Sequence, residues 1–328
     1  MKKKEKCSKY YAYGKSKLLE LYIMQNNEHD IVACIDGYCT HDKICGIPIL
    51  HPSKINFTGL DEVIVIFAVS SEAIQSIFAF LSRLGLTFRK DFILYSEFFY
   101  LHFCSKAFKN LESLSIEKGS CQRYEAFVLN SVKPHHTTIL GSVLLDALLD
   151  RIHQEWIPGA IMEVGAYEGG NALALLSLNK YAVTRPYYVM DSFEGFPVVT
   201  DFDPLLFGEG DYATKTPYNL ISNGFAVFDN TEVIKGFVPK SFDLLPKDLV
   251  LSLVFYDCDL YQPALDTFIY AWNRLSPGGY MVVHDYFAES GGFEGVKVAV
   301  DEFFLDLPVI VTEFSENTMA VIKKPLIQ

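Results

Sequence analysis

The sequence predicts two α/β domains of the Rossmann-like type, each built around a parallel sheet. Three observations carry this prediction. Short apolar segments alternate with amphipathic segments of helical period. Acidic residues recur directly after the apolar segments, and 328 residues at 50% hydrophobic content are enough for two cores. The polar stretch Asn110–Gln122 separates the two halves, so we place the domains at residues 1–112 and 113–328.

In the first domain, the apolar segments predict strands and the periodic segments predict helices. The expected strands are 10–13, 31–35, 63–69 and 92–95, with a short extended piece at 46–50 and helices at 16–25 and 72–84. This alternation is typical of a parallel sheet.

Asp36 follows the second of these strands, 22 residues after Gly14, where a Rossmann-type domain places the acid that binds a ribose. The glycine fingerprint is reduced to Gly14, so a structural or dimerising domain is the favoured interpretation. Tyr13-Gly14, Ile35-Asp36 and Gly46–Leu50 resemble the N-terminal domain of bacterial sugar-modifying enzymes, such as acyltransferases that act on nucleotide-linked sugars.

Overall composition excludes several classes of function. A net charge of −12 argues against nucleic acid as a partner, because phosphate contacts need clustered Lys and Arg. No apolar run approaches the ~20 residues of a membrane span, and the basic start is not followed by the apolar core of a signal peptide. Seven scattered cysteines indicate reduced thiols and a cytoplasmic protein. Cys34, Cys39, His41 and Cys45 match no common zinc spacing, so we expect buried thiols there.

The second domain opens with two expected helices, 123–132 and 140–153. Between them lies a polar loop whose His135 and His136 could reach a ligand, although exposed loop histidines are the simpler interpretation.

The second domain is organised around the stretch from Pro158 to Leu176. Ala160–Val164 predicts a buried strand, glycines follow, and a helix begins near Asn171. The stretch lacks both the phosphate-loop ending and the dinucleotide spacing. Glu163 at the strand end suits a positively charged cofactor such as S-adenosylmethionine; an ordinary tight turn is the alternative. The expected cofactor contacts here are Glu163, Gly165, Ala166, Tyr167, Gly169, Gly170 and Asn171.

Further cofactor contacts are expected after the next two strands, 187–190 and 232–234. Asp191 is placed to bind the two ribose hydroxyls, with Ser192 beside it. Lys235 and Gly236 lie on the adenine side. The long segment Thr200–Gly224 between these strands reads as an irregular lid over the substrate.

Acidic residues and a histidine follow the next two strands. Asp257 and Asp259 come after strand 249–256, before a helix over 261–274, and His284-Asp285 comes after a turn at 276–279 and strand 280–283. Carboxyl ends of neighbouring parallel strands share one edge of a sheet, so these side chains should converge. Such oxygen-rich sites suit Mg²⁺, which lowers the pKa of a bound hydroxyl so that a nearby base can take its proton. The alternative for Asp259 is a helix N-cap.

Taken together, these motifs resemble the macrocin O-methyltransferase family of class I S-adenosylmethionine enzymes, which methylate sugar hydroxyls. The resemblance covers roughly residues 137–304. It rests on Glu163-x-Gly-x-x-x-Gly-Gly170, Asp191–Pro197, Lys235-Gly236, Asp257-x-Asp-Leu-Tyr261, Ser276–Gly279, His284-Asp-Tyr286 and Ala299–Glu302.

The resemblance implies a class I methyltransferase domain and assigns roles at the acidic edge. Asp257, His284 and Asp285 would hold Mg²⁺ or another divalent cation, and Asp257 and His284 would be catalytic. The family usually has two aspartates where this chain has His284-Asp285, so metal preference stays open. The resemblance also implies a small-molecule sugar substrate, which could be a nucleotide sugar or a surface-glycan precursor, and self-association. Two alternatives remain: a metal-independent methyltransferase with His284 as base, and an inactive sugar-binding scaffold.

Overall fold

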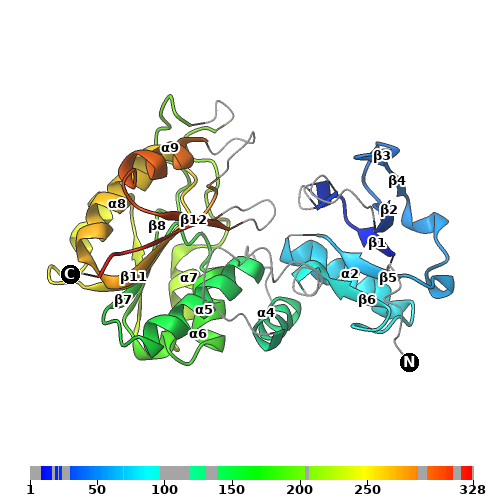
Figure 1. Cartoon of the computed structure of the whole chain (residues 1–328), viewed down its shortest axis with the longest axis horizontal. Helices are drawn as coiled ribbons and strands as arrows, with labels where there is room; N and C mark the ends of the chain where they lie inside the picture. The colour runs from blue at the N-terminus through cyan, green and yellow to red at the C-terminus, as the bar shows by residue number, and fades with distance from the viewer. Residues whose placement is uncertain are drawn as a thin grey trace. The chain divides into compact units, whose positions relative to one another are not determined.

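The computed structural model describes residues 9–16, 19–20, 22–23, 30–68, 70–96, 118–130, 139–203, 207–286, 294–312 and 319–326 (Figure 1). The chain divides into two compact units, Met1–Cys104 with Cys121–Pro134, and Ser105–Ser120 with His135–Gln328. The expected boundary between residues 112 and 113 lies outside the described residues, as do His135 and His136.

The first unit is built on a six-stranded sheet in the order β3-β4-β2-β1-β5-β6. Its strands are β1 (Tyr10–Tyr13), β2 (Ile31–Ile35), β3 (Lys43–Ile44), β4 (Ile47–Leu50), β5 (Val63–Ile66) and β6 (Phe92–Leu94). All neighbouring pairs from β4 to β6 are parallel, which confirms the expected Rossmann-like sheet. The two-residue β3, antiparallel to β4, is too short to show a period and was not predicted.

Two helices of the first unit are fully described. The second of them, which belongs to this unit from Cys121 onward, was expected at residues 123–132 as the opening of the second domain. Helix α2 (Ser71–Arg83) begins where the Ser70 side chain accepts a hydrogen bond from the N–H of Ala73, as an N-cap serine should. Helix α4 (Lys118–Asn130) starts five residues before the predicted helix, and Gln75 in α2 donates to the Val128 carbonyl at 2.7 Å. The short 3₁₀ turns η1 (Pro52–Lys54) and η2 (Phe57–Gly59) connect β4 to β5.

The second unit contains a seven-stranded sheet in the order β12-β13-β11-β10-β7-β8-β9. Its strands are β7 (Ala160–Val164), β8 (Tyr187–Asp191), β9 (Thr231–Lys235), β10 (Leu251–Tyr256), β11 (Leu275–Val283), β12 (Val309–Thr312) and β13 (Met319–Lys323). From β9 to β11 every pair is parallel, whereas β13 is antiparallel to both β11 and β12.

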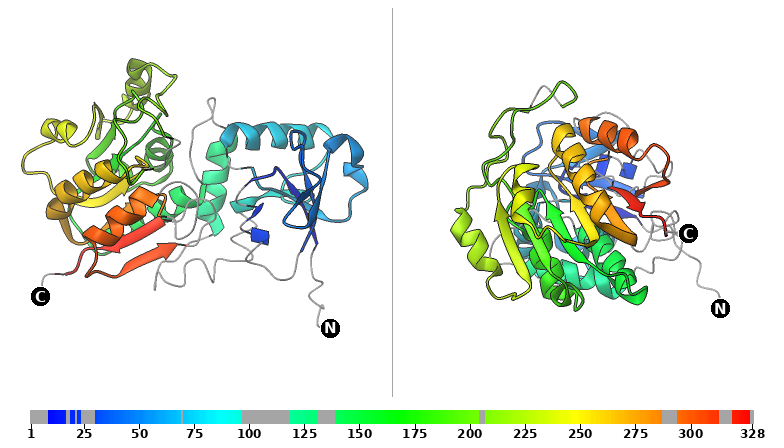
Figure 2. Two further views of the ribbon diagram at one scale, coloured as in Figure 1. Left: turned by 90° about the horizontal axis from the view of Figure 1, so that it is seen from above. Right: turned by 90° about the vertical axis from the view of Figure 1, so that its left-hand side faces the viewer.

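Helices cover both faces of this sheet. Helices α5 (Ile139–Gln154) and α6 (Gly170–Leu178) lie on one face, and α8 (Tyr261–Arg274) and α9 (Glu294–Phe303) lie on the other (Figures 1 and 2). Helix α7 (Tyr218–Phe225) contacts β9, and η3 (Ala182–Thr184) and η4 (Lys240–Leu244) are short turns. All six residues of β10 are buried, as a central parallel strand between two helical layers requires.

This strand order fixes where a ligand can enter. The chain runs from β7 outward through β8 to β9, then crosses back to β10 and continues in the opposite direction to β11. The order therefore reverses between β7 and β10, and open parallel sheets bind ligands at the carboxyl ends of strands beside such a point.

Two expectations for the second domain were wrong in part. Residues 276–279 do not form a separate turn, because β11 runs through them and Gly279 packs directly against the Ser252 backbone. The segment 200–224 is not wholly irregular, because α7 begins within it. Strands β12 and β13 were not predicted.

Among the described residues, no helix is both long and apolar enough to cross a bilayer.

Candidate active site

A cavity of about 290 Å³ opens at the carboxyl edge of the second sheet, beside the reversal between β7 and β10. Residues that follow β7, β8, β9 and β10 all contribute to its wall. The predicted site residues that line it are Gly165, Ala166, Tyr167, Asn171, Asp191, Ser192, Gly236 and Asp257.

Gly165 lets the ends of β7 and β10 approach each other. Its φ is +90°, and a Cβ atom built on it would lie 2.2 Å from the Asp257 carbonyl oxygen. The Asp257 N–H donates to the Val164 carbonyl at 2.8 Å, which extends the pairing of β7 and β10 to this point. The glycine is therefore required by the neighbouring backbone, and it brings Asp257 into the same wall as the loop that follows β7.

Asp191 joins the loops that follow β7 and β8. Its Oδ2 accepts the Tyr167 N–H at 2.8 Å, and its Oδ1 accepts the Phe193 N–H at 2.6 Å. Burial raises the pKa of Asp191 although both hydrogen bonds oppose the shift. The carboxylate therefore holds this part of the cavity wall in place. Its predicted role is to bind the ribose there.

The structure does not bring Glu163 into the cavity wall. Its side chain is only 1% exposed, and its carboxyl group accepts a hydrogen bond from the Tyr187 hydroxyl at 2.8 Å. Burial raises the pKa of Glu163 to about 8. At neutral pH the group is therefore largely uncharged and satisfied by β8, so it offers little negative charge to a bound cation.

Three other predicted cofactor residues also lie away from the wall. Gly169, with a φ of +79°, is the N-cap of α6, and Gly170 is the buried first residue of that helix. Lys235 forms an exposed ion pair with Glu194 at 2.8 Å. Of the two residues predicted for the adenine side, only Gly236 lines the cavity.

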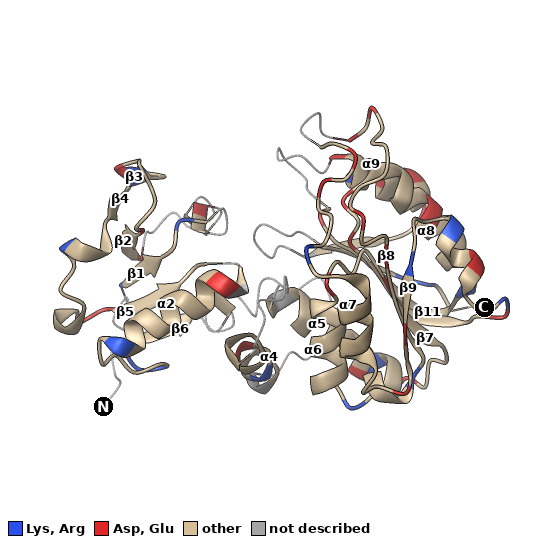
Figure 3. Cartoon of the chain, turned by 180° about the vertical axis from the view of Figure 1, so that it is seen from behind, with Lys and Arg blue, Asp and Glu red and all other residues tan. Residues whose placement is uncertain are grey.

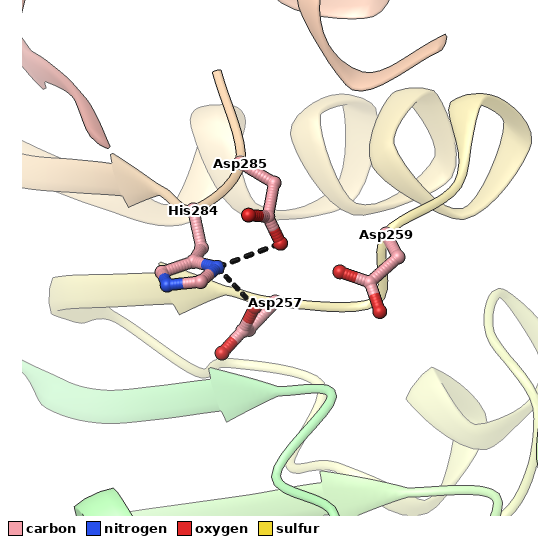
Figure 4. A group of neighbouring side chains, drawn as sticks. All are labelled: Asp257, Asp259, His284 and Asp285. Carbon is pink, nitrogen blue, oxygen red and sulfur yellow. Dashed lines mark hydrogen bonds and ion pairs between the residues drawn. The ribbon is translucent and has the colours of Figure 1, made fainter. Parts of the chain in front are cut away.

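Asp257, Asp259, His284 and Asp285 converge at the same edge (Figure 4), as expected. One potential ligand atom from each lies within 4.8 Å of the others. The Nδ1 atom of His284 lies 2.8 Å from Asp257 Oδ1 and 2.7 Å from Asp285 Oδ2, between the two carboxyl groups. Acidic residues also recur along the loops beside α9 (Figure 3).

The charges of this cluster depend on one another. Burial lowers the pKa of His284, but Asp257 and Asp285 outweigh it and raise that pKa well above its usual value. Burial raises the pKa of Asp285, yet the imidazolium lowers it overall. Burial and the neighbouring Asp285 raise the pKa of Asp259 well above its usual value. These shifts favour a protonated His284 beside an ionised Asp285.

Asp259 is not the N-cap of α8. Leu260 occupies the cap position without a side-chain bond, and the Tyr261 N–H donates to Asp203 Oδ1 at 2.8 Å. The cap therefore comes from the segment between β8 and α7. Asp259 lines the cavity wall and does not serve as a helix cap.

A residue with left-handed backbone follows each of four strands at this edge. They are Tyr167 (φ 50°) after β7, Phe193 (φ 56°) after β8, Asp259 (φ 63°) after β10 and Asp285 (φ 58°) after β11. Each conformation is unfavourable for a residue with a side chain, by roughly 1–2 kcal/mol, and persists because the surrounding structure holds it.

Sequence reasoning missed part of the wall. The wall residues that it did not assign to the site are Val164, Met190, Gly195, Phe196, Pro197, Tyr212, Phe237, Val238, Cys258 and Pro263. Phe237 and Val238 directly follow Gly236, which was predicted, so their place in the sequence could have identified them. Tyr212 lies in the long segment before α7, where no pattern marked it.

The first unit contains no comparable cluster among its described residues. The expectation of buried thiols there is correct for Cys34 and wrong for Cys39, which is half-buried, and for Cys45, which is exposed. Asp36 accepts hydrogen bonds from the N–H groups of Lys15, Tyr38 and Cys39, all at 2.8 Å. Its carboxylate therefore holds the loops after β1 and β2 together.

Known proteins are similar to part of this chain. Mycinamicin III 3''-O-methyltransferase from Micromonospora griseorubida is 29% identical over 165 residues, which is 45% of this chain and 65% of the relative. An 8-demethyl-8-(2,3-dimethoxy-alpha-L-rhamnosyl)-tetracenomycin-C 4'-O-methyltransferase from Streptomyces olivaceus is 29% identical over 163 residues, or 45% and 62% of the two chains. This chain thus spans less than two thirds of the length of either relative. The solved structure of the O-methyltransferase NovP is 20% identical, with a TM-score of 0.49 over 60% of this chain and 84% of that one.

A family model described as Macrocin-O-methyltransferase (TylF) matches residues 109–309. That range is more than half of the 328 residues, and it contains the glycine loop, Asp191 and the cluster around Asp257. The chain therefore belongs to the macrocin-O-methyltransferase (TylF) family.

Proposed function

We propose that this protein transfers the methyl group of S-adenosylmethionine to a hydroxyl group of a small-molecule sugar, either free or nucleotide-linked. The observation that carries the proposal is the single cavity shared by Asp191, the loop at Gly165 and the Asp257–Asp259 loop. Cofactor groups and reacting groups thus line one space. Membership of the family and the names of the relatives, which describe O-methyl transfer, support the same reaction.

The cofactor side of the cavity offers directional polar groups. Asp191 has lone pairs left after its two backbone bonds and would accept from ribose hydroxyls. Asn171 accepts a hydrogen bond from Ser142 at its Oδ1, so its Nδ2 is the end that can donate to a carboxylate. Because Gly165 has no side chain, the loop after β7 lies directly against the Asp257 backbone. A cofactor bound along this loop would have its reactive end close to the cluster.

The cluster also fits a divalent cation. Asp257, His284 and Asp285 would hold it, since the His284 Nδ1 contacts of 2.7 and 2.8 Å are near the ~2.9 Å ligand spacing that metal bonds of ~2.1 Å give in an octahedron. A nitrogen in an otherwise oxygen set favours Mn²⁺ or a similar metal more than it favours Mg²⁺. Such an ion would lower the pKa of a bound hydroxyl group.

A carboxylate is better placed than His284 to act as the base. The Nδ1 atom of His284 lies between the two flanking carboxyl groups and would be a ligand of the cation, so it is not free to take a proton from the substrate. Asp259 lines the cavity and makes no bond to His284. We therefore assign Asp259, whose raised pKa makes it the more basic carboxylate once it is ionised, as the group that receives the proton of the acceptor hydroxyl, with Asp257 and Asp285 beside it. A cytoplasmic location and self-association stay predictions from sequence.

The experiment is a titration of S-adenosylhomocysteine into the protein by calorimetry, followed by turnover assays with dTDP-L-rhamnose and simple pyranosides. We expect micromolar affinity for S-adenosylhomocysteine with or without chelator, and turnover that chelator removes and Mn²⁺ or Mg²⁺ restores. Absence of cofactor binding would leave the sugar-binding scaffold. Turnover that survives chelator would support the metal-independent alternative.

Two substitutions sharpen this experiment. Asp257→Asn should abolish turnover while S-adenosylhomocysteine still binds, because it removes charge from the cluster and leaves the Gly165 backbone contact unchanged. His284→Asp would create the pair usual in the family and should shift the preference toward Mg²⁺, measured as the ratio of activities with Mg²⁺ and Mn²⁺. An unchanged ratio would argue that His284 does not contact the cation.

A further inference from the structure

Tyr212 contributes a partly exposed aromatic ring to the wall of the candidate active-site cavity. It lies on the segment between β8 and α7 and lines the same space as Asp257 and Asp259. Its ring packs on Phe196 at 4.9 Å between centroids and lies edge-on to Phe207 at 6.1 Å. The residue is nevertheless 58% exposed. One part of the ring is thus fixed by aromatic neighbours, and the rest is available to a ligand.

The backbone fixes the position of Tyr212. The Phe196 N–H donates to the Asp211 carbonyl at 2.8 Å, and the Gly210 N–H donates to the Phe196 carbonyl at 3.0 Å. Gly195, with φ +85°, allows this contact, since a Cβ atom there would lie 2.4 Å from the Asp211 carbonyl oxygen. Tyr212 itself has φ 60°, unfavourable for an aromatic residue. The backbone pairing therefore holds Tyr212 beside the cavity at a cost in local strain.

The hydroxyl group of Tyr212 is electrostatically coupled to the acidic cluster. Burial raises its pKa, and Asp259 and Asp285 add to the shift, so the phenol stays protonated and can donate a hydrogen bond. A molecule seated here would meet a flat apolar ring together with carboxyl groups. Pyranose sugars match this chemistry, because they have an apolar C–H face and an edge of hydroxyl groups.

We propose that Tyr212 binds the acceptor sugar, packing its ring on the C–H face of the pyranose and donating its hydroxyl to a sugar oxygen. The hydroxyl group that reacts then faces Asp259. This inference rests on the proposed function and deepens it, since it names the residue that selects a pyranose. The cofactor contacts at Asp191 and Gly236 are separate parts of the wall and do not depend on Tyr212.

The test measures steady-state turnover and binding for the full-length wild type, Tyr212→Phe and Tyr212→Ala. The probes are dTDP-L-rhamnose and the methyl pyranosides of rhamnose, glucose, galactose and mannose. The matched control is Tyr38→Ala, which removes a tyrosine that is 99% exposed in the first unit. Calorimetry measures the affinity for S-adenosylhomocysteine, and for the same sugars in its presence, so that binding is tested even without turnover.

We expect Tyr212→Ala to raise the KM for the sugar by about tenfold or more with kcat changed by less than about threefold, because ring contact is lost. Tyr212→Phe should raise KM by only about two- to fivefold, because the ring remains. Affinity for S-adenosylhomocysteine should be unchanged in both, and Tyr38→Ala should match the wild type.

Three outcomes would overturn the proposal. The first is an unchanged KM in Tyr212→Ala. The second is a loss of S-adenosylhomocysteine affinity as large as the loss of sugar affinity, which would assign the ring to the cofactor. The third is a wild type that binds S-adenosylhomocysteine but none of the sugars. A wild type that fails to bind S-adenosylhomocysteine at all would instead remove the proposed function.

Discussion

Asp203 caps helix α8 from outside the helix, by accepting the Tyr261 N–H at 2.8 Å across 58 positions of sequence. The same carboxyl group accepts the N–H and the hydroxyl of Thr200, and it is only 6% exposed. The Phe202 ring lies 4.3 Å from that of Tyr261. The base of the segment that carries Tyr212 is thereby attached to the helix that follows Asp257–Asp259.

We expect Asp203→Ala to lower the free energy of unfolding by roughly 1–3 kcal/mol, because a helix cap and buried hydrogen bonds are lost. Activity should fall further than stability explains, since the Asp257–Asp259 loop of the proposed site leads directly into α8. Chemical denaturation and kcat are the measurements. Asp201→Ala, an exposed acid on the same segment, is the matched control and should change neither. Equal effects at the two positions would show that charge alone is responsible.

Gly165→Ala should destabilise the second unit by several kcal/mol, because the added methyl group would meet the Asp257 backbone at 2.2 Å. The control is Gly85→Ala. Its φ of +84° gives similar backbone strain, but no atom lies within 4 Å of the added group. That variant should lose only about 1–2 kcal/mol. Similar losses in denaturation experiments would mean that the close approach of β7 and β10 is not rigid.

Asp191→Asn should weaken S-adenosylhomocysteine binding by roughly 10- to 100-fold, or about 1.4–2.7 kcal/mol. The substitution removes a charge, and one of the two acceptors becomes a donor that opposes a backbone N–H. Calorimetry measures the affinity. Glu194→Gln, an exposed acid on the same loop, is expected to bind like the wild type. Unchanged binding by the Asp191 variant would remove the ribose assignment.

Stability should fall as pH rises from about 5 to 8, in part because of Glu163. Its pKa is about 8 in the folded protein and about 4.5 in the unfolded chain. Between these values the folded state holds the proton that the unfolded state has released, so the contribution is full below pH 4.5 and is lost as pH rises toward 8. The difference is of the order of 3–5 kcal/mol. Glu163→Gln should flatten this part of the profile, measured by denaturation at pH 5, 6.5 and 8. The same slope in both proteins would contradict the assignment.

The sequence predicted those features whose signal is local. Continuous apolar runs marked β1, β2 and β7 at their observed bounds. The convergence of Asp257 with His284-Asp285 followed from the parallel order of strands, because residues after neighbouring strands must share an edge.

Features that depend on distant partners were not predictable in the same way. Glu163 ends its strand as expected, but the Tyr187 hydroxyl on β8 takes its carboxyl group away from the cavity wall. The cap of α8 comes from Asp203, 58 positions earlier in the sequence, and no local signal marks such a partner. Tyr212 reaches the cavity through backbone pairing with Phe196, and no periodic pattern encodes such pairing.

The left-handed residues after β7, β8, β10 and β11 bear on how this protein can evolve. A glycine at any of these four positions would relieve strain, so selection for heat resistance alone should favour it there. Such changes would also remove the side chains of Tyr167, Phe193, Asp259 or Asp285 from the edge where the reaction is proposed to occur. Thermal stability and catalytic turnover therefore place opposite requirements on these four positions. A protein evolved in the laboratory for heat tolerance alone should lose activity first through substitutions at these positions.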